Sequence, residues 1–518
     1  MEVPAGGSVL VVDFGGQYAH LITRALRSLG VFALLVSASQ GASGLLREAS
    51  QRGARGVVLS GGPSSVWEAG HDGVAEAALS LGVPVLGICY GHQLLAKVLG
   101  GRVGRAPRGE FGPTIVEVLE EDTILRGLPG RLRVWMSHND AVLEPPPGAR
   151  VLARSPGSPV AAFELQRPGG PRVYGVQWHP EVAHSQGGLE LLGNWASLTG
   201  LLGTWRPGDI VGELVEQVRR AAPAGVAVAA VSGGVDSTVA AVIAQMALRE
   251  RLVPVFIDHG LHPEGEVERA LGILRGSGLD PVVVDAQEEF LSALRGVVDP
   301  EEKRRVVGRV YGEVLLREAR RLGAEYLVQG TIYPDVIESG ARPGADVIKT
   351  HHNVGGLPKG LGLKLIEPLR WLYKDEVREI ARALRLPREL LEKQPVPGPG
   401  LAVRVEGEVT PEKLAIAKRA DAIVREVVER RGLHRGLWQY FAVLTASRAT
   451  GVKGDRRSYG YVVAVRVVES REAMTAAPAR LPWEALEEMA ARITGEIPGV
   501  TRVVYDVTPK PPATIEWE

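Results

Sequence analysis

The chain has 518 residues, of which 45% are hydrophobic and 23% are charged, a composition typical of a globular protein with several domains. Sixty basic residues balance sixty acidic ones, so no net charge favours binding to nucleic acid or to an anionic membrane. The single cysteine excludes an internal disulfide and agrees with a cytoplasmic location, and we expect neither a signal peptide nor a membrane span.

The first two hundred residues alternate strand-like and helix-like segments. Continuous apolar runs at 8–14, 56–62 and 84–90 are typical of parallel strands that are buried on both faces. Helical periodicity follows each of these runs, as at 17–30 and 91–101. Repeated strand–turn–helix units predict a doubly wound α/β domain with a parallel sheet, which we place at residues 1–203.

The same alternation restarts in the next segment, 204–396, and predicts a second doubly wound parallel-sheet domain. Its strand-like runs lie at 225–231, 252–260, 280–286 and 324–331. A Pro/Gly-rich stretch at 394–403 ends the alternation. The remaining residues, 397–518, contain a long helical pattern at 411–432 followed by strand-like runs, which predicts a smaller α+β domain.

The only cysteine, Cys89, lies in the sequence VLGICYGHQ, between a strand-like and a helix-like run. Gly87 and Gly91 lie two residues to either side, as a tight turn requires. A helix N-terminus directly after Cys89 would favour the thiolate and would offer amide N–H groups to an oxyanion. Taken alone, however, a lone thiol is more often a small buried hydrophobic side chain.

A histidine and a glutamate in the sequence QWHPEV strengthen the hypothesis of a nucleophile. His179 and Glu181 lie two residues apart at an expected strand end, where side chains at this spacing project to the same side. Glu181 could then orient His179 as a general base. The alternative is a solvated His-Pro-Glu turn.

GICYGHQ together with WHPE resembles the class I glutamine amidotransferase domain. By this resemblance Cys89 is the nucleophile, His179 is the base and Glu181 is the carboxylate that orients it. The segment LSGGPSSV resembles the family's oxyanion strand, which implies that Gly62 and Tyr90 supply two backbone N–H groups. Such a domain hydrolyses glutamine through a thioester and releases ammonia.

A second turn with a different chemistry follows the strand-like run at 225–231. Gly233 and Gly234 allow backbone N–H groups to approach an anion, and Ser232 and Ser237 add hydroxyl donors. The lysine of a Walker loop is missing. Asp236 would repel phosphates unless Mg²⁺ lay between them, so we expect Mg²⁺ together with ATP, with Asp236 as its ligand. A glycine-rich turn without function is the alternative.

SGGVDS resembles the pyrophosphatase-type loop of enzymes that cleave ATP to AMP and pyrophosphate. The resemblance implies that the following residues bind ATP: Ser232, Gly233, Gly234, Val235, Asp236, Ser237 and Thr238. It also implies that an oxygen of the substrate is adenylated and that a nucleophile then displaces AMP.

An ammonia source joined to an adenylating domain predicts an ATP-dependent amination, and several classes of substrate fit. A tRNA-thiolating enzyme would need further cysteines and a basic surface. A glutamine-dependent NAD synthetase would have a nitrilase-like glutamine domain, and an asparagine synthetase would have cysteine where this chain has Glu2. A nucleotide-sensing dimer without turnover is the alternative from a different class.

The later segments resemble the GMP synthase family, in the family's usual order. They are QGTIYPDVIES (329–339), KTHHNVGGLP (349–358), EPLRWLYKDEVR (367–378), PGPGLAVRV (397–405), GVKGDRRSYG (451–460) and TRVVYDVTPKPPATIEWE (501–518). The resemblance implies that XMP, ATP and glutamine are the substrates, and that the C-terminal domain forms a homodimer and contributes residues to the XMP site.

The same resemblance assigns residues to the XMP site. It implies that Arg304 contacts the nucleotide phosphate and that Asp455 and Glu516 hold the ribose or the base. Lys510 lies beside two prolines and is a candidate for a rigid phosphate contact, although without the resemblance a solvated tail would be the better explanation.

The resemblance also implies that a segment around 350–380, which includes Lys374, closes over ATP and XMP and excludes water. His351, His352 and Asn353 form a polar cluster in this segment, where catalytic groups often lie. The two histidines lack a third ligand at regular spacing, which argues against a metal site.

Two short stretches depart from the family pattern. Lys-Gln-Pro-Val-Pro at 393–397 replaces Arg-His-Pro-Phe-Pro, so a planar guanidinium group and an aromatic ring are lost. His262 and Pro263 lie where the family tends to have Leu-Arg. We expect activity to survive, since neither stretch belongs to the triad or to the phosphate loop.

Overall fold

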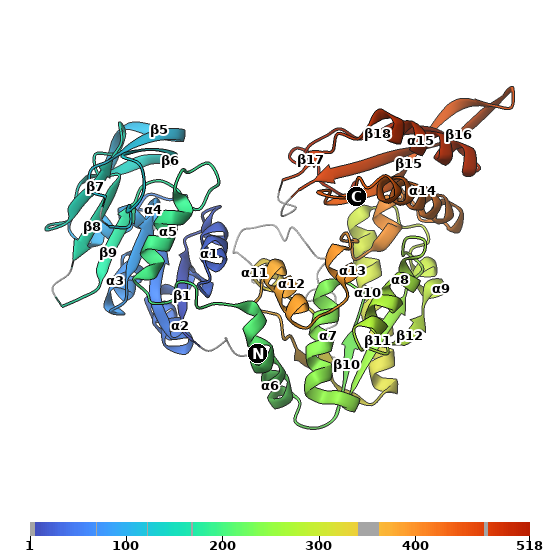
Figure 1. Ribbon diagram of the computed structural model, residues 1–518, viewed down its shortest axis with the longest axis horizontal. Coiled ribbons are helices and arrows are strands. Elements are labelled where there is room, and N and C mark those ends of the chain that lie inside the picture. Colours follow the sequence, from blue (N-terminus) through green and yellow to red (C-terminus); the bar gives the residue numbers. More distant parts are fainter. Residues whose placement is uncertain (1–5, 69, 122, 167–168, 340–361, 471–474) are drawn as a thin grey trace. The chain divides into compact units, whose positions relative to one another are not determined.

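The computed structural model describes residues 6–68, 70–121, 123–166, 169–339, 362–470 and 475–518. The chain divides into two compact units, with the division between residues 206 and 207 (Figure 1). The first unit contains the segment predicted as 1–203. The second contains residues 207–396 of the next predicted segment together with the segment predicted as 397–518, and the boundary between these two stays a prediction.

A nine-stranded sheet forms the centre of the first unit, in the order β2-β1-β3-β4-β9-β8-β7-β5-β6. The five strands from β2 to β9 are parallel, and the remaining four pair antiparallel. The strands are β1 (Ser8–Asp13), β2 (Ala33–Ser37), β3 (Ala54–Leu59), β4 (Val85–Ile88), β5 (Arg102–Val118), β6 (Arg131–Glu144), β7 (Arg150–Arg154), β8 (Ala162–Gln166) and β9 (Arg172–Val176). The three predicted apolar runs contain β1, most of β3 and β4, whereas the antiparallel extension was not predicted.

Helices cover both faces of the parallel part of this sheet. They are α1 (Ala19–Ser28), α2 (Gly41–Arg52), α3 (Asp72–Ser80), α4 (Tyr90–Val98) and α5 (Gly188–Ser197), with a short 3-10 turn η1 (Ala38–Gln40). Helix α1 contacts α5, whereas α2 contacts α3 and α3 contacts α4. With right-handed crossovers, this pairing places α1 and α5 on one face and the other three on the opposite face. The domain is therefore doubly wound.

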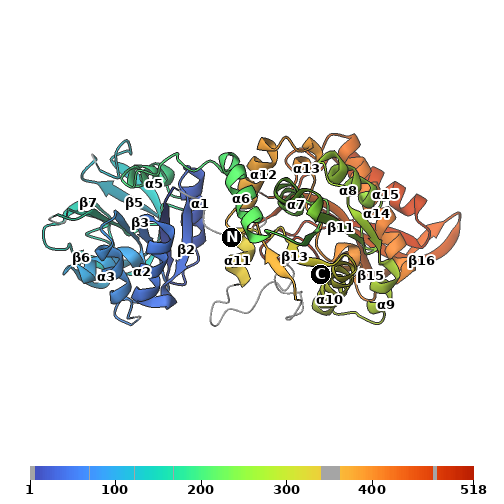
Figure 2. The same cartoon turned by 90° about the horizontal axis from the view of Figure 1, so that it is seen from below.

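Five parallel strands form a second sheet in residues 207–518, in the order β12-β11-β10-β13-β14. Strands β11 and β13 of this sheet are labelled in Figure 2. The strands are β10 (Val226–Ala230), β11 (Leu252–Asp258), β12 (Val282–Asp285), β13 (Ala324–Val328) and β14 (Lys364–Ile366). The helices are α6 (Val211–Ala221), α7 (Val235–Leu248), α8 (Glu266–Gly276), α9 (Gln287–Ala293), α10 (Pro300–Arg321), α11 (Tyr333–Ser339), α12 (Lys374–Ala383) and α13 (Arg388–Glu392), with 3-10 turns η2 (Pro207–Ile210) and η3 (Arg249–Arg251).

The C-terminal part is α+β, as predicted. It contains η4 (Gly400–Arg404), α14 (Pro411–Arg430), β15 (Gln439–Lys453), β16 (Arg456–Glu469), β17 (Ala477–Pro478), α15 (Trp483–Glu496) and β18 (Val500–Tyr505). Strands β15 and β16 form a long antiparallel ribbon, and β18 pairs parallel to β16. One hydrophobic cluster includes Val228 of β10, Leu315 of α10 and Val463 of β16, so the C-terminal part and the five-stranded sheet share a core.

No helix in the described part of the chain combines the length and the apolar character that spanning a membrane requires.

The close approach of α4 to β3 gives a test of the first fold. We expect Gly91→Ala to destabilise the first unit by about 3 kcal/mol, because the added Cβ would lie 2.1 Å from the carbonyl oxygen of Leu59. Gly73→Ala in α3 is the matched control, since its Cβ would meet only the Ala42 Cβ, at 4.0 Å. Alanine should stabilise this exposed helical position by about 0.5 kcal/mol. Scanning calorimetry of the full chain measures both changes, and a wild-type unfolding temperature for Gly91→Ala would contradict the packing described here.

Candidate active sites

The first candidate site lies at the carboxyl ends of the parallel strands of the nine-stranded sheet. Gly61 and Gly62 follow β3, Cys89 follows β4, and His179 lies shortly after β9. A Cβ added to Gly61 would lie 3.0 Å from the Cε1 atom of His179 and 3.7 Å from the Cβ of Cys89. The sheet therefore brings together the residues that the sequence predicted as one site.

Cys89 occupies a strained turn between β4 and α4. Its φ of 53° and ψ of −103° lie outside the regions that residues with a side chain prefer. The Cys89 N–H donates to the carbonyl of Val176 at 2.8 Å, which holds the turn against β9. A Cβ at Gly87 would lie 2.5 Å from the Gly91 carbonyl oxygen, which explains the two flanking glycines. The turn has the geometry expected for a nucleophile between a strand and a helix.

His179 contacts both of its predicted partners. Its Nδ1 lies 2.7 Å from Oε1 of Glu181, and their side chains are only 5% and 0% exposed. Burial alone would lower the pKa of His179, but the charges and hydrogen bonds of Cys89 and Glu181 outweigh it and raise this pKa well above its ordinary value. The imidazolium form is therefore favoured next to the sulfur. β9 ends at Val176, so His179 lies beyond the strand and Glu181 lies in the turn that begins at Pro180, and the pairing does not come from strand geometry.

Several polar groups surround the sulfur of Cys89. Its Sγ lies 3.7 Å from the carbonyl oxygen of Ser137 and 3.8 Å from Nε2 of Gln177. Among the described residues, the backbone N–H groups of Gly62 and Tyr90 have no hydrogen-bond partner. Both amides are therefore available to a ligand. The sequence reasoning missed Gln177, whose signal is a polar residue inside the otherwise apolar run VYGVQW.

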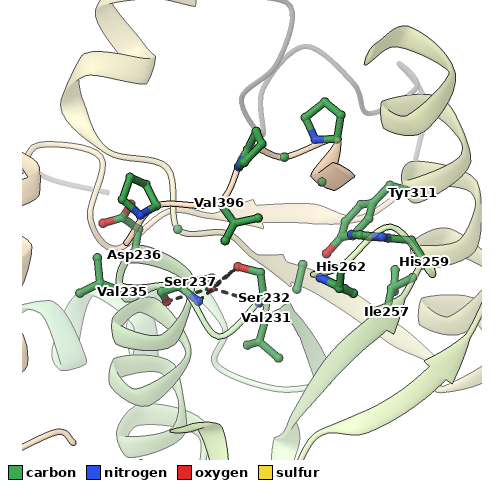
Figure 3. Close-up of a pocket in the computed structure, with 18 of the residues that line it drawn as sticks. Val231, Ser232, Val235, Asp236, Ser237, Ile257, His259, His262, Tyr311 and Val396 are labelled. Atoms are coloured by element: carbon green, nitrogen blue, oxygen red, sulfur yellow. Dashed lines mark hydrogen bonds between the residues drawn. The ribbon is translucent and has the colours of Figure 1, made fainter. Parts of the chain in front are cut away.

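The second candidate site is a cavity of about 440 Å³ in residues 207–518 (Figure 3). Its walls include the residues that follow β10, β11 and β13. The chain continues from β10 to β11 on one side, while β13 lies on the other side of β10. The cavity therefore lies at the point where the strand order reverses, the usual place for a ligand in an open α/β sheet.

The predicted phosphate loop forms one wall of this cavity. Ser232 and Ser237 hydrogen-bond through their hydroxyl oxygens at 3.1 Å, and the Gly234 N–H donates to Oγ of Ser232 at 3.4 Å (Figure 3). Gly233 has a φ of 69°, and a Cβ there would lie 2.6 Å from the Cβ of Ala270 in α8. Helix α7 begins at Val235 and includes Thr238, which is fully buried. The helix N-terminus therefore points its amide groups at the cavity.

Asp236 is only partly satisfied in this wall, since one of its two carboxylate oxygens lacks a partner. Its Oδ1 is buried without a hydrogen-bond partner, and its Oδ2 lies 3.6 Å from Nζ of Lys374, the first residue of α12. Loss of hydration raises the pKa of Asp236, Lys374 acts against this, and Asp335 adds to it. A divalent cation bound next to Asp236 would compensate the negative charge of its carboxylate. Within the described ranges there is no group of three side chains that could hold a metal ion, so phosphate oxygens would have to supply further ligands.

The two stretches that depart from the family pattern both line the cavity. His262 stacks on His259 with ring centroids 3.8 Å apart, and burial lowers the pKa of both side chains (Figure 3). Lys393 forms an ion pair with Glu266 and donates to the carbonyl of Gly233 at 3.3 Å. Lys393 therefore binds the backbone of the phosphate loop and helps to fix its position.

Two of the residues assigned to XMP lie near each other. Arg304 lines the cavity and donates to the backbone carbonyl of Glu518. Glu516 accepts hydrogen bonds from Arg404 at 2.9 and 3.0 Å and from Nε2 of Gln439 at 3.0 Å. The segment that contains Glu516 thus packs beside α10.

The other two XMP candidates lie elsewhere. Asp455 is exposed in the turn between β15 and β16 with a φ of 61°. Gln439, which binds Glu516, lies at the opposite end of this ribbon, so one chain does not bring Asp455 and Glu516 together. Lys510 is anchored through its backbone N–H, which donates to the Ala476 carbonyl at 2.8 Å. His351, His352 and Asn353 lie outside the described residues.

Comparisons with known proteins identify all three parts of the chain. Residues 10–197 match the family described as glutamine amidotransferase class-I, residues 209–316 match NAD synthase, and residues 426–517 match the GMP synthase C-terminal domain. The chain is 70% identical over 510 residues to the glutamine-hydrolyzing GMP synthase of Aeropyrum pernix, with 98% of each chain covered. The chain belongs to the GMP synthase family.

Other members of the GMP synthase family are similar along their whole length. The enzyme of Pyrobaculum aerophilum is 51% identical over 510 residues, covering 98% of this chain and 99% of its own. That of Thermus thermophilus is 50% identical over 511 residues, covering 98% of this chain and all of its own. The combination of domains that the motifs predicted is therefore confirmed.

The contact between His179 and Glu181 predicts how the sulfur reacts. In Glu181→Gln, the imidazolium loses a charged partner, so the pKa of His179 should fall and the pH profile of Cys89 alkylation by iodoacetamide should change. The rate of alkylation at neutral pH should fall about tenfold. Mass spectrometry follows the reaction without interference, since the chain has no other cysteine. An unchanged pH profile would contradict the coupling.

Proposed function

We propose that the chain converts XMP, ATP, glutamine and water into GMP, AMP, pyrophosphate and glutamate. The observation that carries this proposal is the presence of two distinct sites on one chain: Cys89 beside the His179–Glu181 pair, and a serine- and glycine-rich phosphate loop facing a cavity. The first site can release ammonia and the second can activate the nucleotide that accepts it.

In the first site, the sulfur of Cys89 attacks the side-chain carbonyl carbon of glutamine. The N–H groups of Gly62 and Tyr90 stabilise the oxyanion, which fits their lack of other partners. His179 transfers its proton to the leaving nitrogen, the C–N bond breaks and ammonia departs. Water then attacks the thioester with His179 as base, so the C–S bond breaks and glutamate is released. Glu181 keeps the imidazole oriented throughout.

In the second site, residues 232–238 hold the phosphates of ATP. Mg²⁺ bound together with ATP would neutralise the phosphates and the Asp236 carboxylate, and the unpartnered Oδ1 of Asp236 fits this role. An oxygen of XMP attacks the α-phosphorus of ATP and pyrophosphate leaves. Ammonia then attacks the activated ring carbon and AMP departs with the oxygen.

We assign XMP to the part of the cavity next to Arg304, with Arg304 at the phosphate and Glu516 at the ribose or the base. Asp455 and Lys510 are kept as XMP ligands, and the position of Asp455 at the far end of its ribbon suits a contact with XMP bound to a second copy. Lys374 begins α12 at the edge of the cavity and would close the site over the nucleotides.

Two variants separate the two sites. We expect Cys89→Ala to abolish glutamine-driven GMP formation and to leave ammonium-driven formation within about twofold of the wild type, because the thiol acts only in the release of ammonia. Asp236→Ala should lower both reactions at least about a hundredfold, since activation by ATP would fail. GMP, AMP and pyrophosphate are measured with each nitrogen source.

Loss of the ammonium-driven reaction in Cys89→Ala would contradict the division into two sites. If the wild-type chain bound XMP but released neither AMP nor pyrophosphate, it would instead be the nucleotide-sensing dimer.

We also propose that the chain forms a homodimer through its C-terminal part in the cytoplasm. The sheet there exposes large apolar side chains, namely Val452, Tyr459 and Val504. Light scattering should give twice the chain mass of 55.3 kDa, and Val452→Glu together with Tyr459→Glu should give the mass of one chain. Leu46→Glu, at an exposed leucine of the first unit, is the matched control. A wild-type mass of one chain would contradict the dimer.

A further inference from the structure

A hydrogen bond between His71 and Tyr90 connects the loop after β3 to the helix that follows Cys89. Nδ1 of His71 lies 2.9 Å from the hydroxyl oxygen of Tyr90. The Tyr90 side chain is buried, and Phe14 packs against both rings, with centroids 5.0 Å from that of His71 and 5.1 Å from that of Tyr90. The phenol and the imidazole are thus held in one place, although the reaction proposed for Cys89 uses neither.

The ring of Tyr90 also packs against Gly62. A Cβ added to Gly62 would lie 3.3 Å from Cγ of Tyr90 and 3.1 Å from the Cβ of Phe14. Gly62 and Tyr90 are the residues whose backbone N–H groups the proposed reaction assigns to the oxyanion, and neither N–H has a hydrogen-bond partner among the described residues. A shift of the Tyr90 ring would therefore move both donors at once.

A second connection fixes the same loop to the same helix. Nζ of Lys97, in α4, donates to both carboxylate oxygens of Asp72 at 2.9 Å and to the carbonyl of Val66 at 3.0 Å. Asp72 directly follows His71 in the chain. Val66, His71 and Asp72 are thus attached to α4 at its first residue, Tyr90, and near its end, at Lys97.

We propose that His71 is a positioning residue for glutamine hydrolysis, which acts by holding the Tyr90 phenol so that the N–H groups of Gly62 and Tyr90 point at the oxyanion. This inference rests on the proposed function. The oxyanion forms only after the sulfur has attacked, so the contact should affect kcat rather than the binding of glutamine.

The test compares two substitutions of His71, of which only one keeps a polar atom that can bond to Tyr90. His71→Phe keeps a ring against Phe14 but removes the hydrogen bond to Tyr90, whereas His71→Asn retains a polar atom near the position of Nδ1. With XMP, ATP and Mg²⁺ present, we expect His71→Phe to lower kcat for glutamine-driven GMP formation about tenfold, with KM for glutamine within about twofold of the wild type. His71→Asn should recover kcat to within about threefold of the wild type.

Tyr90→Phe removes the other half of the same bond and should lower kcat as much as His71→Phe. The double variant should be no slower than either single one, since the bond can be lost only once. Ammonium-driven GMP formation should be unchanged in all variants. His434→Phe, at an exposed histidine of residues 207–518, controls for the general effect of such a change and should behave as the wild type.

A wild-type kcat for His71→Phe, equal losses in His71→Phe and His71→Asn, or losses that multiply in the double variant would each overturn the inference. A raised KM with an unchanged kcat would overturn it too, because the contact would then serve glutamine binding. If the wild-type chain formed no GMP from glutamine, the proposed function itself would have failed.

Discussion

Parallel strands point in one direction, so their carboxyl ends collect at one edge of a sheet, and both candidate sites depend on this constraint. In the first unit, β3, β4 and β9 lie side by side and bring Gly61, Cys89 and His179 together. In residues 207–518, β10, β11 and β13 do the same for the loops that line the cavity. The helices and the order of the strands decide which loops meet, and the loops supply the chemistry.

The elements that could be predicted are those that a short stretch of the sequence marks by itself. Long apolar runs identified β1, β3 and β4, and the glycines beside Cys89 and in the phosphate loop marked the turns. Strand β6 was missed because only one of its faces is buried, so its apolar residues alternate with polar ones instead of forming a continuous run. The contact between His179 and Glu181 was predicted correctly for the wrong reason, since a turn at Pro180 rather than an extended strand brings the two side chains together.

Buried charges mark the limit of sequence reasoning, because their partners are far away in the chain. Lys303 is completely buried, and its Nζ donates to the carbonyl of Val405 and binds the carboxylate of Glu518. Arg404 is paired with Asp421 and Glu516 in the same way. A buried cation without such partners would be strongly destabilising, so these pairs fix the last residues of the chain against α10 and η4. The sequence shows each charge but not the tertiary contact that satisfies it.

The tight turns of the two sites place different residues at a positive φ, and the chemistry of each site explains the difference. A phosphate is bound by backbone N–H groups, so the turn of the second site can use Gly233 at a φ of 69° without strain. A nucleophile must carry a side chain, so Cys89 has to adopt a φ of 53° at a cost of about 1–3 kcal/mol. The Cys89 N–H donates to the carbonyl of Val176 in β9, and the Gly91 N–H donates to the carbonyl of Ser60, directly after β3. These hydrogen bonds offset the strain of the turn. The position of the sulfur therefore depends on β3 and β9 as much as on its own turn.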